Sequence, residues 1–180
     1  MESPLVSVII PTYYRNDVLP KAVRSACKQT HSPVEVIVVD DSGERYAKPA
    51  IERFDHVQYV PLPENRGANR ARDAGLEHTS GDYVQFLDDD DRMDQRKIEK
   101  QVTAFERTDS DVSVVYSGVE LSDGRTALPE PEARGDVLSR ALAFEMWPCM
   151  TSTMLLERET LDEIRPLSDR PAGTDLEQII

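Results

Sequence analysis

Two short apolar runs near the N-terminus constrain the fold more than any other feature of the sequence. Leu5–Ile10 (LVSVII) and Val34–Val39 (VEVIVV) are rich in β-branched residues and contain few polar ones. Such runs are typical of strands that are buried on both faces, as parallel strands covered by helices are. Between them, Leu19, Val23 and Ala26 recur at helical spacing. The sequence therefore predicts a β-α-β unit with parallel strands.

The alternation of strand and helix continues to about residue 115. Further strands are predicted at Val57–Leu62, Tyr83–Leu87 and Asp111–Tyr116, and helices at 45–54, 68–78 and 95–107. This order indicates one domain with a right-handed, doubly wound, mostly parallel α/β sheet, whose ligands bind beyond the C-terminal ends of the strands. After it, a hairpin at 122–128, helices at 137–146 and 159–164, and a strand at 152–156 are predicted.

The net charge is −13, from 34 acidic and 21 basic residues. This charge repels nucleic acid and anionic membrane surfaces at long range, so nucleic acid is excluded as a partner. To bind a phosphorylated ligand, the protein would need positive charge at the site to compensate its own acidity, and a divalent cation held by carboxylates supplies it. The acidity, together with 16 arginines against five lysines, fits either a salt-adapted (halophilic) protein or a GC-rich genome, and both remain open. No leader and no long apolar run is visible, which predicts a cytoplasmic chain.

Four consecutive aspartates, Asp88 to Asp91, follow the strand predicted at Tyr83–Leu87. Neighbouring carboxylates repel one another, and a bound cation is the simplest way to stabilise them. In extended backbone, Asp88 and Asp90 point to one side while Asp89 and Asp91 point to the other. We therefore expect a metal at Asp88 and Asp90, and we interpret Asp91 as a solvated or helix-start carboxylate.

Polar segments also follow the first two predicted strands. Pro11–Arg15 (PTYYR) comes after the first, and Asp40–Ser42 (DDS) comes after the second. Because the C-terminal ends of parallel strands meet at one edge of a sheet, these segments and the aspartates are expected to open into one crevice.

The series SVIIPTYYR, VIVVDDSG, ENRGANRARDAG, SGDYVQFLDDDD and KIEKQ resembles, in order and spacing, the N-terminal half of the family 2 glycosyltransferases. The resemblance covers residues 5–118. It implies a GT-A fold and an enzyme that transfers a hexosyl or related sugar, with inversion, from a nucleotide-diphospho-sugar to an acceptor hydroxyl. It divides the domain into a nucleotide-sugar-binding half, 1–118, and an acceptor-side part, 119–180. Residues 176–180 are an apolar helical start without a stop signal, which predicts a truncated C-terminus.

The resemblance also implies which residues bind the nucleotide. Pro11, Thr12 and Tyr13 would hold it, with Tyr13 stacking on the base. Asp41 would accept a hydrogen bond from the base, and Arg15 would lie beside it.

For the diphosphate end, the resemblance implies that Asp88 approaches the ribose or the metal. Asp90 would coordinate the Mn²⁺ or Mg²⁺ that bridges the two phosphates, and Asp89 belongs to the same nucleotide-binding set. Arg72 is either a ligand-cradling arginine or a surface arginine, since both uses are common on a helix.

An inverting transfer needs a general base, and Asp175 is the candidate that the resemblance indicates. Thr174 stands where the family has the first acidic residue of a pair. Thr174 and Glu177 also form a capping box, so a structural role for Asp175 remains open. Tyr14 and Asp73 stand where the family has Asn, and no role is carried over to them.

Three alternatives compete with this interpretation. VIVVDDS is similar to the acidic strand end of a phospho-receiver signalling domain, but the lysine that such a domain needs after a later strand is missing. A sugar nucleotidyltransferase would begin with a Gly-rich loop, which VIIPTYYR is not. A non-catalytic nucleotide-sugar-binding module of the same fold also remains open. The expected partners are the donor and a saccharide, lipid-linked or protein acceptor, with a membrane surface reached only through further C-terminal residues, at the cytoplasmic face.

Overall fold

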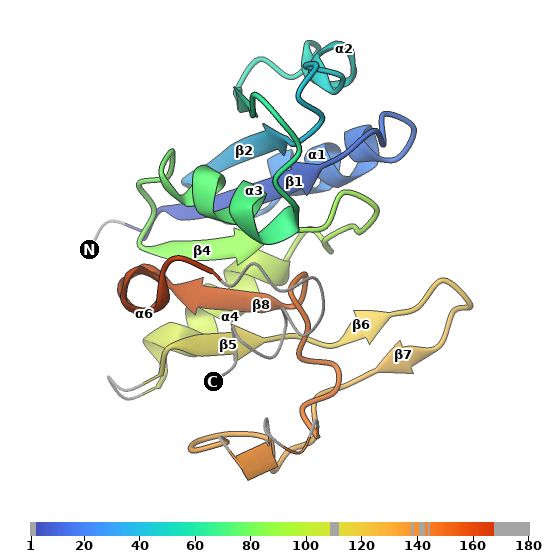
Figure 1. Ribbon diagram of the computed structural model, residues 1–180. Helices are drawn as coiled ribbons and strands as arrows, with labels where there is room; N and C mark the ends of the chain where they lie inside the picture. The colour runs from blue at the N-terminus through green and yellow to red at the C-terminus, as the bar shows by residue number, and fades with distance from the viewer. Residues whose placement is uncertain (1–2, 109–111, 138, 141–142, 144, 168–180) are drawn as a thin grey trace.

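The computed structural model describes residues 3–108, 112–137, 139–140, 143 and 145–167. One six-stranded sheet has the order β3-β2-β1-β4-β8-β5 (Figure 1). Its strands are β1 (Val6–Thr12), β2 (Val34–Asp40), β3 (Val57–Pro61), β4 (Tyr83–Phe86), β5 (Val114–Tyr116) and β8 (Met154–Glu157). The helices are α1 (Leu19–Cys27), α2 (Lys48–Ile51), α3 (Ala68–Leu76), α4 (Lys97–Glu106) and α6 (Arg158–Ile164).

The sheet is mostly parallel, as the sequence predicts. β1 pairs in parallel with β2 on one side and with β4 on the other, and β2 pairs in parallel with β3. β8 is antiparallel to both of its neighbours, β4 and β5. The C-terminal ends of β1, β2 and β4 therefore lie at one edge of the sheet, where the polar segments follow them.

Two apolar layers hold the helices on the two faces of the sheet. Every residue of β1 is buried, and its side chains alternate between the layers. Val8 and Ile10 belong to the layer that includes α1 and α4, whereas Ile9 belongs to the layer that includes α3 and α6. Figure 1 shows α3 and α6 in front of the sheet and α1 and α4 behind it. Full burial of such a side chain contributes about 1.5 to 3 kcal/mol, which explains why these runs form the centre.

Close packing of α3 on the sheet depends on Gly75. A Cβ atom at this position would collide with the side chain of Ile9 on β1. The glycine thus lets α3 approach the central strand closely.

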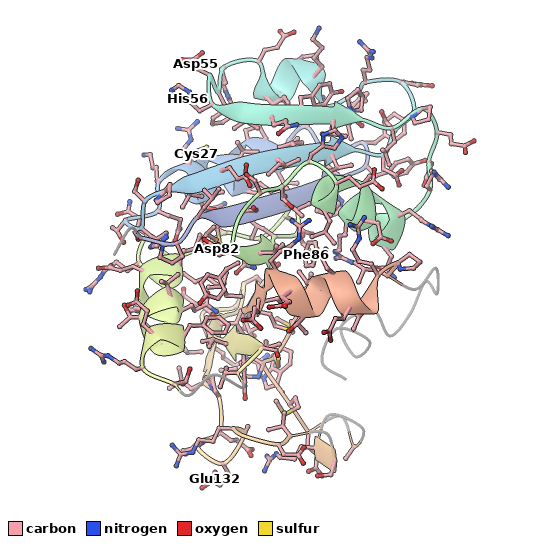
Figure 2. The ribbon with its side chains drawn as sticks, turned by 90° about the vertical axis from the view of Figure 1, so that its left-hand side faces the viewer. Cys27, Asp55, His56, Asp82, Phe86 and Glu132 are labelled. Atoms are coloured by element: carbon pink, nitrogen blue, oxygen red, sulfur yellow. The ribbon has the colours of Figure 1, made fainter. Side chains whose placement is uncertain are left out.

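The hairpin predicted at residues 122–128 is present and projects from the sheet. β6 (Val119–Glu120) and β7 (Thr126–Ala127) pair antiparallel, and Gly124 in the turn has φ +83°. Figure 2 shows Glu132, farther along the chain, at a distance from the sheet. Parts of the helix predicted at 137–146 lie outside the described residues, as do residues 168–180.

Candidate functional site

An open cleft of about 550 Å³ lies at the C-terminal ends of β1, β2 and β4, beside the start of α3. This volume is within the usual range for a small-molecule site. The cleft brings together all of the predicted binding and metal-ligating residues except Asp175: Pro11, Thr12, Tyr13, Arg15, Asp41, Arg72, Asp88, Asp89 and Asp90. Asp175 lies outside the described residues.

The loop after β1 is tied to the loop after β4 by polar contacts. The Thr12 hydroxyl donates a hydrogen bond of 2.7 Å to the buried carboxylate of Asp89. Arg15 forms an ion pair with Asp90 and a longer one, 3.4 Å, with Asp89. Burial raises the pKa of Asp89, and the Thr12 hydrogen bond and Arg15 oppose that shift. The two loops therefore form one wall of the cleft.

Asp40, at the end of β2, is a structural anchor. Its carboxylate accepts hydrogen bonds from the backbone N–H groups of Ser42 and Ala47 and from the Tyr59 hydroxyl. Burial raises the pKa of Asp40, but these hydrogen bonds together outweigh burial and leave the pKa lowered. Asp40 is fully buried and is not among the residues that line the cleft, so it supports the loop after β2 from beneath the cleft.

Asp41 holds the loop that leads into α3. Its two carboxylate oxygens accept hydrogen bonds, each 2.8 Å long, from the backbone N–H groups of Arg66 and Gly67. Gly67 has φ +85°, a conformation that favours glycine, and it directly precedes α3. Burial raises the pKa of Asp41, against the effect of these two N–H donors. Asp41 thus shapes the cleft as well as lining it.

Arg72 is buried. Of the two interpretations given for it, the surface arginine is therefore wrong. Its side chain is 6% exposed, and it donates to Asp88 at 2.9 Å and to Asn69 at 3.1 Å. The guanidinium lies 6.0 Å from the ring centre of Phe86, which Figure 2 labels. Within the described residues its Nε atom has no hydrogen-bond partner. Asp88, on the cleft side, therefore compensates the charge of a buried arginine.

The four aspartates do not follow an extended backbone, so the predicted alternation of their side chains is wrong. Residues 89 and 90 form a turn, closed by a 3.1 Å hydrogen bond from the Asp91 N–H to the Asp88 carbonyl. The turn lets Asp88, Asp89 and Asp90 all line the cleft. Asp91 is exposed, as expected, but it precedes the first turn of α4 and is no helix-start residue.

Tyr13, which lines the cleft, belongs to a group of three tyrosines whose other members, Tyr14 and Tyr46, the sequence did not indicate. Tyr14 has φ +54°, and its ring lies 4.7 Å from the rings of both Tyr13 and Tyr46. All three side chains are partly exposed. The left-handed backbone at Tyr14 turns its ring back between the others, which a sequence pattern does not reveal.

Ser152 is a second residue that sequence reasoning missed. Its hydroxyl accepts a hydrogen bond from the backbone N–H of Asp88, 3.1 Å away, and so helps to fix the aspartate turn. No local signal marks it, because the contact joins segments that are 64 residues apart.

The donor chemistry of the aspartates fits a divalent metal. The side chains of Asp88 and Asp90 are 43% and 52% exposed, and carboxylate oxygens are the ligands that Mg²⁺ and Mn²⁺ prefer. Within the described residues, no three His, Cys, Asp or Glu side chains are grouped to hold a metal. Such a metal would therefore need oxygen ligands from a substrate or from water as well.

Comparison with known proteins identifies the family. The model of Glycosyl transferase family 2 matches residues 7–165. The chain belongs to glycosyl transferase family 2. Its relatives include TuaG of Bacillus subtilis, named as a glycosyltransferase of teichuronic acid biosynthesis, which is 33% identical over 90% of this chain and 66% of its own length. An uncharacterized glycosyltransferase of Rickettsia typhi is 35% identical over 69% of this chain and 39% of its own.

Solved structures share the GT-A fold of this family 2 chain. S. aureus TarS in complex with UDP has a TM-score of 0.74 at 19% identity, over 95% of this chain and 52% of its own. The Pyrobaculum calidifontis mannosyltransferase PcManGT, in complex with GDP-Man and Mn²⁺, has a TM-score of 0.72 at 20% identity, over 98% of this chain and 51% of its own. The chain thus spans between 39% and 66% of the length of these relatives and structural neighbours. Among the described residues, no helix is long and apolar enough to cross a membrane.

Proposed function

We propose that the protein takes part in glycosyl transfer from a nucleotide-diphospho-sugar to an acceptor hydroxyl, with inversion and with help from a divalent metal. The observation that carries this proposal is the cleft, where aromatic, carboxylate and guanidinium side chains meet at the C-terminal edge of a family 2 sheet. The complexes of TarS with UDP and of PcManGT with GDP-Man and Mn²⁺ support this class of donor.

The nucleoside is proposed to bind at the end formed by β1 and β2. Tyr13 is 49% exposed, so its ring offers a face on which a base can stack. Each carboxylate oxygen of Asp41 accepts one backbone N–H and keeps a second lone pair, with which it can accept a hydrogen bond from the base. Pro11 and Thr12 also line the cleft, and Thr12 contacts Asp89.

The diphosphate is proposed to bind at the aspartate turn, where Asp88 and Asp90 would hold Mn²⁺ or Mg²⁺. When bound, the metal would neutralise the charge of the departing nucleoside diphosphate. Arg15 is half exposed and can exchange Asp90 for a phosphate oxygen, since its planar fork suits either acceptor. Arg72 remains buried and holds Asp88 in place, and Asp89 fixes the turn through Thr12.

The acceptor hydroxyl is proposed to attack the anomeric carbon from the face opposite the diphosphate, which inverts the configuration there. Asp175 would take the proton of that hydroxyl, and residues 119–180 would form the acceptor side of the site. Asp175→Asn should slow transfer about 10²-fold or more while sparing donor binding. Near-normal turnover in that variant would instead assign Asp175 to helix capping.

Calorimetric titration tests the donor site directly. UDP, GDP and dTDP are titrated into the chain with and without Mn²⁺, and one of them should bind in a metal-dependent way. Asp90→Ala should abolish the metal-dependent part. Asp55→Ala is the matched control, because this exposed carboxylate precedes β3 and so lies at the opposite edge of the sheet (Figure 2). Unchanged metal-dependent affinity in Asp90→Ala would remove the metal assignment.

A further inference from the structure

A second groove, of about 670 Å³, lies beside α1 and carries a charge opposite to that of the whole chain. Among the described residues that line it, five are cationic and one, Asp17, is acidic. We call it the basic groove and define it by its cations: Lys21, Arg24, Lys28, Arg53 and Arg92. In a protein with a net charge of −13, this is a pronounced local concentration of positive charge.

The cations of the basic groove come from three separate segments. Lys21, Arg24 and Lys28 are spaced i, i+3 and i+7 along α1 and its C-cap, which places them on one face. Arg53 follows α2, and Arg92 comes from the loop after β4. That loop is fastened to α1, because the Met93 N–H donates a 3.1 Å hydrogen bond to the Ser25 hydroxyl. The fold thus assembles the groove from parts distant in sequence.

Within the described part of the chain, none of these five side chains is paired with a carboxylate, although Asp17 lines the same groove. All five residues are exposed, and none of them forms an ion pair there. Arg53 instead lies over the ring of Phe54, 5.3 Å from its centre. Unpaired like charges that line one concave surface repel one another, and a bound anion relieves that repulsion.

The dipole of α1 explains only part of this arrangement. Cations near a helix C-terminus are favourable, and this accounts for Arg24 and Lys28. It does not account for Arg53 or Arg92, which belong to other segments and face the same groove. Forked guanidinium groups together with lysines are the side chains that recognise phosphate.

We propose that the basic groove binds a phosphate-bearing ligand with more than one negative charge. This site is separate from the cleft and does not depend on the proposed glycosyl transfer. The groove shares its loops with the cleft, since Asn16 and Asp17 follow Arg15, and Arg92 follows the aspartate turn. The phosphate can belong either to a soluble ligand or to a lipid headgroup, and the test has one arm for each source.

The first arm titrates inorganic pyrophosphate into the whole chain by calorimetry, in EDTA and at low salt. The second arm measures co-sedimentation with vesicles of phosphatidylcholine, with and without phosphatidylglycerol. The test variant is Arg24→Gln/Lys28→Gln. The matched control is Lys100→Gln/Arg107→Gln, which removes the same charge from two exposed positions on α4 and at its end. Arg53→Gln/Arg92→Gln tests the groove a second time from its other segments.

Binding in at least one arm should weaken about tenfold or more in both groove variants, persist in the control and fall as salt rises. The arm that responds identifies the source of the phosphate. If pyrophosphate binds in the cleft instead, the groove variants and the control variant should have equal affinity for it. Equal binding by the groove and control variants in both arms, or no binding by the unmodified chain, overturns the proposal.

Discussion

The cleft and the basic groove share the loops after β1 and β4, but their cations differ in whether they contact a carboxylate. In the cleft, Arg15 and Arg72 each contact an aspartate. In the groove, the cations are exposed to solvent and form no ion pair with a carboxylate among the described residues. Lys97 is a third case: it is buried, and its ammonium donates to the neutral amides of Gln85 and Gln101. Burial lowers the pKa of Lys97 to about 7. These cations therefore differ in environment: Arg15 and Arg72 contact carboxylates, the groove cations are exposed to solvent, and Lys97 is buried with a lowered pKa.

The largest effect is expected at Lys97. Its pKa is lower in the folded chain than in the unfolded chain, so between about pH 7 and 10 the unfolded state binds more protons. The free energy of unfolding should therefore rise with pH across that window, by up to about 1.4 kcal/mol per pH unit from this group. Urea denaturation across that pH range should show the rise in the unmodified chain.

The control for Lys97 lies on the same helix. Lys97→Met should flatten the rise, whereas Lys100→Met, at an exposed position, should leave it unchanged. If the unmodified chain and Lys97→Met show the same slope, the contrast between a buried and a hydrated cation is wrong.

Asp88→Asn should have the next largest effect on stability. It leaves the Arg72 guanidinium buried without a charged partner, which costs about 2 kcal/mol, less than a fully buried pair because Asp88 is partly exposed. Chemical denaturation measures the loss. The double variant Arg72→Met/Asp88→Asn should recover part of it, and strict additivity of the two single changes would mean that the pair is not coupled.

Thr12→Val should have a smaller effect. The change keeps the shape of the side chain but removes the hydrogen bond to the buried Asp89 carboxylate, at a cost of about 1.5 kcal/mol. The same denaturation experiment measures it. Thr103→Val, at a partly exposed position on α4, is the comparison and should cost less. An equal cost at both positions would show that the link between the two loops adds nothing.

Lys28→Gln should have the smallest effect on folding. Lys28 is exposed and has no carboxylate partner in the described part of the chain, so the free energy of unfolding should change by no more than about 0.5 kcal/mol. Thermal unfolding measures the change. A loss comparable to that of Asp88→Asn would mean that the groove cations support the fold, and the contrast with the cleft would fail.

The strands and helices around the cleft follow the predicted pattern closely. The prediction succeeds for β1 and β2 because a continuous apolar run has one stable location, the centre of the sheet. It also succeeds for the location of the cleft, since parallel strands place their C-terminal ends together. It fails for the side-chain directions of the four aspartates, because a turn stabilised by Ser152 replaces the extended backbone.

Asp73 illustrates what a family pattern leaves unassigned. No role was carried over to it, because the family has Asn at that position. Its buried carboxylate accepts the backbone N–H of Leu167 and lies 3.6 Å from the Arg165 guanidinium. Burial raises its pKa, and these two partners oppose the shift. Both partners lie more than 90 residues away in sequence, so only the folded chain reveals the contact.

The sequence by itself determined the order of the elements, the mostly parallel sheet and the set of residues at its C-terminal edge. These follow from local patterns: apolar runs, helical spacing and polar strand ends. Only the tertiary structure decided that Arg72 is buried against Asp88, that Asp41 holds the loop before α3, and that cations from three segments line one groove. Those facts depend on contacts between distant segments, whose distances and burial exist only once the sheet has brought them together.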